Sequence, residues 1–578
     1  MNLTVKSAVL AALALGASGV ASAVDITTVD AASIAYISGS TAIDTYLQAY
    51  FINSGTDTAL CQSGTIDYYS SIVTPKFVAV ACTANTSTTG ITGNIAYIKE
   101  DNAGSLNGIQ GVQGVSFAGS PYTTGGLQFP TFSQLTSNFC STTAKAAANG
   151  LNAYTSHTCA TASTTVQKIP QMGFADVEGS LFGVNTNTPV ALIGTQTVIL
   201  PFGAAVSLGL YHALQASQGL TVGSELTVDM PSLPKSVLHG IYTGQITSWA
   251  SVQGTSGTTS AVSAQNPQFG ILSADSIGST ATTSGTAWNG SSTALGVTIA
   301  VTAAPLNANV YMCRRGNTSG TEKIAEWFFD NQNCTSAPTI GFRLPSTTIT
   351  TTLCANVNTD GCSWNASIAA VNPVVHPGNG GGDLLDCLVG NDQAGKFAIG
   401  FVSNDNGAGG PSAQQSTTTR RNWRYIRVNG VVPSIENAAA GKYDWITQAY
   451  AYVPPTTVTW AATGNAATLI SAITKGAGTK PNSIGSVGAV AAVNLSKKWY
   501  SDAAKTVSLF DGGALVIPGS VNGSATAAPN AASATVATFA TNPVSTVWKV
   551  KGGVVNNCLL PNVNSTTTAV GSVNYATP

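Results

Sequence analysis

The stretch Cys313-Arg314-Arg315-Gly316-Asn317-Thr318-Ser319-Gly320-Thr321-Glu322-Lys323-Ile324-Ala325-Glu326-Trp327-Phe328-Phe329 joins an arginine to a short turn and a helix. The apolar spacing after the turn predicts the helix. Helix N-termini present unsatisfied N–H groups and partial positive charge. Glycine allows close backbone approach, hydroxyls donate hydrogen bonds, and an arginine fork suits an oxyanion. The pattern therefore predicts an anion cradle built from Arg315, Ser319, Gly320 and Thr321.

An ordinary helix cap is the alternative interpretation, because Ser or Thr at this place satisfies a backbone donor without any ligand. Ser-Gly-Thr also occurs at Ser54, Ser63, Ser256 and Ser284. Only the copy at Ser319 has both a preceding arginine and a following helical pattern.

The composition excludes several partners. The chain has 578 residues, of which 8% are charged, and a net charge of −1; soluble domains usually carry roughly 25% charged residues. No basic excess would attract nucleic acid, and no polybasic run would bind a membrane surface. We expect a surface rich in Ser, Thr, Asn, Gln and Gly, which suits a protein outside the cytoplasm.

The N-terminus has the features of a secretory signal. Lys6 precedes a short apolar run, and Ala21-Ser22-Ala23 is an Ala-x-Ala cleavage site. The run is shorter than the ~20 residues of a membrane-spanning helix. We expect residues 1–23 to be removed, a mature chain that begins at Val24, and a periplasmic or extracellular location without membrane insertion.

The ten cysteines all lie in the expected mature chain, and an even count in an exported protein indicates disulfides. The predicted local pairs are Cys61–Cys82, Cys140–Cys159 and Cys354–Cys362, and Cys387–Cys558 is a candidate bridge between lobes. The chain contains no Cys-x-x-Cys, and its four histidines are scattered. We therefore expect neither a metal site nor a cofactor.

Strand-like runs alternate with helical patterns, which is typical of an α/β fold with open, largely parallel sheets. Phe77 to Val80 reads as a strand, Thr197 to Leu200 as a strand that ends at Pro201, and Gly203 to Gln215 as a helix. Three stretches read as loops or insertions: roughly Thr56 to Ile91, Thr255 to Gly290 and Ser520 to Ser545. In open α/β sheets, ligands bind at the carboxyl ends of strands.

Several segments, in order, resemble the phosphate-binding proteins of bacterial phosphate ABC importers, which have a type 2 periplasmic binding fold. Ile37-Ser38-Gly39-Ser40-Thr41-Ala42 is similar to the opening anion loop of that family. Met172 to Asp176 resembles a strand ending in a ligand-contacting aspartate, and the Arg315 loop resembles the family's arginine and Ser-Gly-Thr loop. The other similar segments are Ile199–Gly203, His239–Trp249, Gly378–Gly382 with Ile399–Val402, Val428–Ser434 and Ala440–Tyr443.

The resemblance implies an α/β fold of two lobes joined by two crossing strands, with the anion between the lobes. Residues 24–200 and 404–578 would form lobe one, and residues 201–403 lobe two. The implied ligand-binding residues are Ser40, Thr41, Ser105, Asp176, Arg315, Ser319, Gly320 and Thr321. The chain departs from the family at Asn317, where an acid usually pairs with the arginine, and in its greater length.

Asp176 has two interpretations. An acid at the end of a buried strand can simply cap the next helix. Beside an anion it has a sharper use, since a carboxylate accepts a hydrogen bond from protonated phosphate and repels fully ionised sulfate.

Three functions follow from these patterns. The first is an exported solute-binding protein for phosphate or a similar oxyanion, with an ABC importer permease as a possible partner. The second is an extracellular surface, matrix or adhesive protein on the same fold, which the low charge and long Ser/Thr/Ala-rich loops favour. The third, a secreted phosphatase, lacks a recognisable nucleophile with its base, so we expect no enzyme.

Overall fold

The computed structural model describes twenty segments of the chain. They are residues 23–52, 59–71, 76–100, 104–115, 126–136, 138–147, 151–160, 164–221, 226–252, 309–316, 318–330, 374–378, 381–393, 396–404, 423–433, 437, 443–476, 515–516, 546–548 and 562–564. Residues 1–22 of the expected signal segment 1–23 lie outside them, as do the pair Cys354–Cys362, Asn317 and the stretches 255–290 and 520–545.

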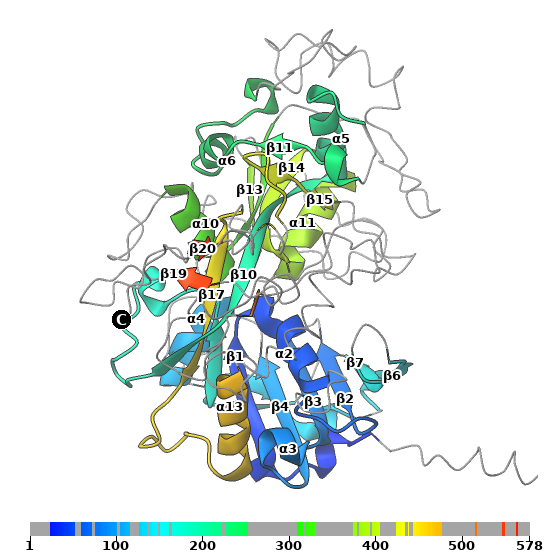
Figure 1. Ribbon diagram of the computed structural model, residues 1–578, viewed down its shortest axis with the longest axis vertical. Coiled ribbons are helices and arrows are strands. Elements are labelled where there is room, and N and C mark those ends of the chain that lie inside the picture. Colours follow the sequence, from blue (N-terminus) through cyan, green and yellow to red (C-terminus); the bar gives the residue numbers. More distant parts are fainter. Residues whose placement is uncertain are drawn as a thin grey trace, which may run out of the picture.

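One long sheet runs through both halves of the molecule (Figure 1). Its strand order is β13 (Val374–Gly378), β12 (Tyr311–Arg315), β14 (Ala398–Ser403), β10 (Ile193–Ser207), β17 (Ile446–Val453), β9 (Met172–Ala175), β1 (Ile34–Gly39), β4 (Asn94–Glu100), β3 (Phe77–Thr83), β2 (Asp67–Ser71), β7 (Tyr154–Cys159) and β6 (Cys140–Lys145). We call the part from β17 to β6 the first lobe. The second lobe contains β13, β12 and β14 with β15 (Trp423–Tyr425).

Strand β10 connects the two lobes. Its N-terminal part pairs with β17, up to Pro201 opposite Ile446, and its C-terminal part pairs with β14 from Phe202 onward. The prediction of a strand ending at Pro201 and a helix from Gly203 is therefore wrong: β10 continues to Ser207, and α5 is Leu208–Ser217. Pro201 lies where β10 changes its pairing partner from β17 to β14. A proline, which has no N–H, therefore does not interrupt either ladder of hydrogen bonds in its middle.

The expected α/β fold with crossing strands is confirmed, since β10 leaves the first lobe and β17 returns to it. Between them, β15 pairs with the C-terminal part of β10, and β16 (Arg427–Val428) pairs with β11 (Ser232–Leu233). These pairings belong to the second lobe. The expected lobe limits at residues 200 and 404 remain a prediction, and the strand pairing places the return to the first lobe close to Ile446.

Parallel pairing occurs inside each lobe, whereas β10 pairs antiparallel with both β14 and β17 where the lobes meet. In the first lobe, β1 lies between β4 and β9 and is parallel to both. Helices α2 (Asp44–Ile52) and α13 (Gly464–Gly476) share one core cluster with this sheet, and Tyr50 Oη donates to the Ala472 carbonyl over 3.1 Å. The carboxyl ends of β1, β4 and β9 therefore meet at one edge of the first lobe.

In the second lobe, β12 is parallel to both of its neighbours, β13 and β14. Helix α11 (Gly381–Gln393) packs on one face through Leu384, Leu385 and Leu388. Helices α6 (Lys235–Tyr242) and α10 (Gly320–Asp330) belong to the core on the other side. Strand β12 leads directly toward α10, so the end of this strand and the start of this helix are held together.

Aromatic side chains fill the junction between the lobes. Trp445, immediately before β17, stacks on Phe328 of α10 at 5.1 Å and meets Phe401 of β14 edge-on at 4.7 Å. Phe202 of β10 lies 6.4 Å from the same indole. Aromatic pairs of this kind contribute roughly 0.5–1.5 kcal/mol beyond their buried area. The crossing segments thus share a packed core with the helix that opens on the candidate site.

Three disulfides occur in the described residues, where no cysteine is free. The predicted pairs Cys61–Cys82 and Cys140–Cys159 are confirmed. The predicted lobe-crossing bridge from Cys387 to Cys558 is wrong, because Cys387 of α11 pairs with Cys313 of β12 inside the second lobe. The helix packs directly on this strand, so its cysteine finds a local partner. Disulfides indicate an oxidising compartment.

The strand expected at Phe77 to Val80 is confirmed as part of β3, but the prediction that the rest of Thr56 to Ile91 is a loop is wrong for much of its described part. The stretch contains β2, β3 and the short helix α3 (Thr86–Thr89). The serines and threonines of this stretch give it the composition of a loop, but Tyr69 and Phe77 are buried in the core of the sheet.

In the described residues, no helix is long and apolar enough to span a bilayer.

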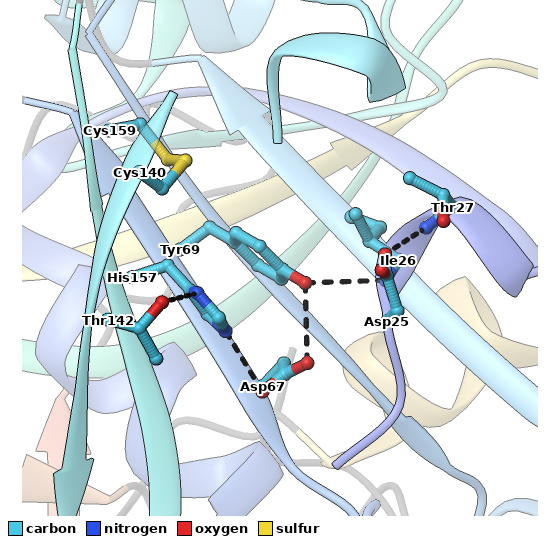
Figure 2. A network of polar contacts seen from close by, with 9 residues as sticks. All are labelled: Asp25, Ile26, Thr27, Asp67, Tyr69, Cys140, Thr142, His157 and Cys159. Atoms are coloured by element: carbon cyan, nitrogen blue, oxygen red, sulfur yellow. Dashed lines mark hydrogen bonds and ion pairs between the residues drawn. A yellow bond between two sulfur atoms is a disulfide. The ribbon is translucent and has the colours of Figure 1, made fainter. Parts of the chain in front are cut away.

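A polar network ties the outer strands of the first lobe together (Figure 2). His157 of β7 lies between Thr142 of β6, 3.1 Å from Nδ1, and Asp67 of β2, 3.0 Å from Nε2. Tyr69 stacks on the imidazole at 4.4 Å and donates to the same carboxylate over 3.3 Å. The disulfide Cys140–Cys159 closes the β6–β7 hairpin beside it. The network therefore explains how a strongly polar hairpin stays attached to the sheet.

Candidate functional site

The loop after β1 supplies the first site residues. Ser40 caps the short 3₁₀ helix Thr41–Ile43: its Oγ accepts from the Ala42 N–H over 3.1 Å. The same hydroxyl donates to the Asp176 carboxylate in a short hydrogen bond. Ser40 is buried and Thr41 is half-buried. The Ser40 hydroxyl therefore both caps the turn that follows β1 and makes a hydrogen bond with Asp176.

Asp176 follows β9 directly and is buried. Its backbone N–H donates to Ser105 Oγ over 3.1 Å, and Ser105 lies in the short helix α4 (Gly104–Leu106). Burial raises the pKa of the Asp176 carboxyl, while the hydrogen bonds of Ser40 and Ser105 and the positive charges of Arg315 and Lys99 lower it. Ser40, Ser105 and Asp176 therefore come together at the carboxyl edge of the first lobe.

Three glycines allow this convergence. A Cβ placed on Gly39 or on Gly108 would lie 2.0 Å from the Phe174 carbonyl oxygen, and one on Gly173 would lie 2.0 Å from the Gly108 carbonyl oxygen. Gly39 also has a φ of +108°, which L side chains rarely adopt. The backbones of β1, β9 and the turn Asn107–Gly111 thus touch, which brings the residues they carry within hydrogen-bond range.

The second lobe contributes Arg315 and the start of α10. Arg315 is the last residue of β12 and is buried, as are Ser319, Gly320 and Thr321. Ser319 immediately precedes the helix, and its buried Oγ has no hydrogen-bond partner among the described residues. A buried hydroxyl without a partner costs free energy, so it is a group that a ligand oxygen could satisfy.

The two lobes meet directly at these residues. The Leu106 N–H of the first lobe donates to the Thr318 carbonyl of the second over 3.1 Å. A Cβ placed on Gly320 would lie 2.4 Å from Ser105 Oγ and 2.8 Å from Asp176 Oδ2. A Cβ on Gly104 would lie 3.7 Å from an Arg315 guanidinium nitrogen. Helix α10 therefore opens onto the acid and the serine of the opposite lobe.

Of the eight predicted site residues, six are brought together by these contacts: Ser40, Ser105, Asp176, Arg315, Ser319 and Gly320. Thr41 and Thr321 lie beside them in the sequence, at the start of their helices. Neither threonine hydroxyl makes a hydrogen bond within the described segments, so the structure leaves their roles untested.

Arg314, the residue before Arg315, has two acidic partners. It makes a short ion pair with Glu322 and a second contact of 3.4 Å with Glu326, which also binds Lys323 Nζ over 2.8 Å. All four side chains are buried. The sequence analysis missed this network, although Glu322 and Glu326 are four residues apart and so share one face of a helix. The network fixes β12 against α10 on both sides of the Arg315 loop.

Lys99 was also missed. It is fully buried near the end of β4, and Nζ contacts the Gly39 carbonyl oxygen at 3.2 Å and Asp44 Oδ1 at 2.8 Å. The neighbouring Glu100 is buried too, and its carboxylate accepts from Asn107 Nδ2 over 2.7 Å. The signal was the pair of opposite charges at the end of an otherwise apolar strand, directly before the Ser105 turn.

The arrangement can bind an oxyanion. Arginine donates charge-assisted hydrogen bonds, serine hydroxyls donate neutral ones, and the N-terminus of α10 presents backbone N–H groups with partial positive charge. Asp176 can accept a hydrogen bond from an oxyanion that still carries a proton. Among the described residues, no cluster of three or more His, Cys, Asp or Glu side chains could hold a metal ion.

No family model matches this chain, and a comparison with curated proteins finds no match. Solved structures do resemble it. A phosphate ABC transporter substrate-binding protein with bound phosphate, from Clostridium perfringens, is 12% identical, with a TM-score of 0.32; the match covers 76% of this chain and 91% of that one. PstS from Borrelia burgdorferi is 9% identical, with a TM-score of 0.25 and coverage of 73% and 87%.

An ABC-type phosphate transport receptor from Vibrio cholerae is 11% identical, with a TM-score of 0.22; the match covers 50% of this chain and 70% of that one. Likeness at this level does not assign a function, which has to be inferred from the residues of the site.

Proposed function

We propose that this chain is an exported solute-binding protein that holds phosphate or a similar oxyanion between its two lobes. The observation that carries the proposal is the meeting of Asp176 and Ser105 of the first lobe with Gly320, at the start of α10, in the second. Arg315 reaches the same place, close to Gly104. A carboxylate, hydroxyls, a guanidinium and a helix N-terminus together match a partly protonated oxyanion.

Each component has its own role in this proposal. Arg315 supplies formal positive charge, while Ser40, Thr41, Ser105, Ser319 and Thr321 supply hydroxyls, and Gly320 lets backbone N–H groups approach. Asp176 accepts a hydrogen bond from the protonated oxygen of the anion and discriminates against fully ionised oxyanions. Binding rather than turnover is the proposed activity, and an importer permease is the proposed partner.

Equilibrium calorimetry on the purified mature chain tests the proposal with phosphate, arsenate and sulfate. Wild type should bind phosphate and arsenate more tightly than sulfate. Hydrogen bonds to charged groups are worth roughly 1.5–3 kcal/mol, so Arg315→Ala should weaken phosphate binding by at least about tenfold. Lys145→Met, which removes an exposed positive charge from the β6–β7 hairpin, is the matched control and should bind like wild type.

Failure of wild type to bind any of the three anions would contradict the proposal. The surface or adhesive function would then be the better explanation. Equal phosphate affinity in wild type and Arg315→Ala would show that phosphate binds elsewhere. Neighbouring genes provide an independent check, because permease genes accompany a transport role and secretion or adhesin genes a surface role.

A further inference from the structure

Lys99 is an unusual residue to find beneath an anion-binding loop. It lies in β4, opposite Ile37 of the parallel strand β1, and its side chain is fully buried. Burying an ammonium group costs several kcal/mol unless charges and hydrogen bonds compensate. The groups that compensate for Lys99 therefore indicate what the lysine does.

The first of these groups belongs to the loop that carries Ser40. Lys99 Nζ donates to the Gly39 carbonyl over 3.2 Å. The N–H of the same peptide, from Ser40, donates to the Phe174 carbonyl over 2.9 Å. Both polar groups of the Gly39–Ser40 peptide are therefore held, one by the lysine and one by β9. The orientation of this peptide determines where Ser40 Oγ points, and Oγ meets Asp176.

The second group is Asp44, the first residue of α2, whose Oδ1 lies 2.8 Å from Nζ. Asp44 is 19% exposed, whereas Lys99 is completely buried. Water therefore screens the carboxylate more than the ammonium, and the positive charge is only partly cancelled on the buried side. That side contains the Ser40 loop and Asp176.

Among the described residues, two positive charges act on Asp176. Arg315 approaches from the second lobe and Lys99 from beneath the loop; both favour the ionised carboxyl, with Arg315 the larger influence. Glu100 follows Lys99 on β4, so its side chain points to the opposite face of the sheet, where Asn107 binds it. Lys99 is thus a second positive charge at the site, additional to Arg315.

We propose that Lys99 is a positioning residue of the anion site: it fixes the Gly39–Ser40 peptide and supplies a second positive charge, which Asp44 attenuates. This inference rests on the proposed anion-binding function for its effect on affinity, but its effect on Asp176 can be measured without any ligand. If Lys99 only anchors α2, its substitution should alter stability and leave both the phosphate affinity and the titration midpoint of Asp176 unchanged.

Two substitutions with opposite expected effects test the proposal. Lys99→Met keeps the length of the side chain and removes its charge. Asp44→Asn leaves the lysine charge and removes the carboxylate that attenuates it. Lys145→Met, on the exposed hairpin, serves again as a charge-matched control. Circular dichroism establishes that each variant is folded, and Asp44→Asn still tests the proposal if Lys99→Met does not fold.

The ligand-free measurement follows the Asp176 carboxyl by NMR titration of aspartate-labelled protein, with Asp176→Asn used to identify its signal. The midpoint should rise in Lys99→Met, because a positive charge that favours the carboxylate is gone, and fall in Asp44→Asn. An unmoved midpoint in both variants would overturn the proposal. So would a shift in the same direction in both, since that indicates altered packing rather than charge.

Calorimetry with inorganic phosphate measures the effect on affinity. Lys99→Met should weaken binding roughly tenfold, and Asp44→Asn should strengthen it a few-fold. If the Asp176 midpoint moves as expected while wild type binds no phosphate, the role of Lys99 stands and the proposed function is wrong. If phosphate binds equally well to wild type and both variants, the proposal for Lys99 is wrong and the proposed function stands.

Discussion

Gly320 is the candidate-site glycine that packs against side chains of the opposite lobe. A Cβ at this position would meet Ser105 Oγ at 2.4 Å and Asp176 Cβ at 2.7 Å. Both neighbours lie in the other lobe and are buried, so neither can move aside easily. This glycine is needed for contact between the lobes rather than for the helix that it begins.

Gly320→Ala should therefore separate binding from stability. The added methyl group keeps the lobes from closing on the anion, and we expect phosphate affinity to fall at least tenfold. Alanine favours a helix over glycine by up to about 1 kcal/mol, so the melting temperature of the ligand-free protein should not fall. Calorimetry and thermal unfolding of the same preparation check both. A clear loss of stability would show that the lobes are also closed without ligand.

Asp176→Asn should change selectivity. The substitution removes a carboxylate that repels fully ionised anions, so sulfate affinity should rise relative to phosphate. Burial raises the pKa of Asp176, and in wild type the ratio should also shift toward sulfate as the pH falls and this carboxyl takes up a proton. Competition calorimetry from pH 5 to 8 measures the ratio. Asp444→Asn, at an exposed position, should leave the ratio unchanged.

At the scale of elements, β12 and α10 are locked together by the buried network of Arg314, Glu322, Glu326 and Lys323. Burial is the main reason that the pKa of Glu322 is raised to about 7; Glu326 adds to the effect and Arg314 opposes it. The folded protein therefore binds this proton at a pH where the unfolded chain, with its ordinary value near 4.5, has released it.

This difference predicts how stability depends on pH. The contribution of a raised Glu322 pKa is fully present below about pH 4.5 and is lost as the pH rises to about 7. One pKa unit corresponds to roughly 1.4 kcal/mol, so the total is on the order of 3 kcal/mol. In Glu322→Gln, which cannot titrate, the free energy of unfolding should fall less over this range. Urea unfolding at pH 4.5, 6 and 7.5 measures this free energy. If it changes with pH equally in wild type and Glu322→Gln, the assignment of the effect to Glu322 is wrong.

Local patterns predicted the elements around the site better than those elsewhere. The helix after Arg315 and the strand that leads to Asp176 both appear as expected. Each has an apolar pattern that periodicity detects. The loop prediction for Thr56 to Ile91 failed at β2 because its serines and threonines suggested a loop, whereas β2 is held against β7, which lies more than 80 residues further along the chain.

The contacts inside the site could not be predicted in the same way. Lys99 and Glu100 look like a solvated strand end, and only the pairing of β4 with β1 shows that they are buried. Pro201 suggested a strand end, but β10 changes partners there and continues. Cys387 was paired with the wrong cysteine because distance along the chain contains no information about α11 packing on β12. Each error concerns a long-range contact.

At the scale of the whole molecule, the site is covered from both sides. The Leu106–Thr318 hydrogen bond and the close packing at Gly320 join the lobes across it. Since β10 and β17 are the strands that pass between the lobes (Figure 1), we expect the lobes to separate about these strands when an anion enters the proposed site. The aromatic core around Trp445 lies at the same junction.

Small-angle X-ray scattering should detect this separation. The ligand-free protein should have a larger radius of gyration than the protein with saturating phosphate, because binding favours the state in which both lobes contact the anion. Arg315→Ala at the same phosphate concentration should keep the larger value. An identical radius in all three samples would mean that the lobes do not move, and that the site is reached by another route.

The Cys313–Cys387 bridge has a consequence for what keeps Arg315 in place. The bridge joins two cysteines that are 74 residues apart in the sequence, one on β12 and one on α11. Arg315 lies two residues after Cys313 on β12, which also pairs with β13 and β14. The strand that carries Arg315 is thus tied covalently to α11, so its position depends on an oxidising environment as well as on packing.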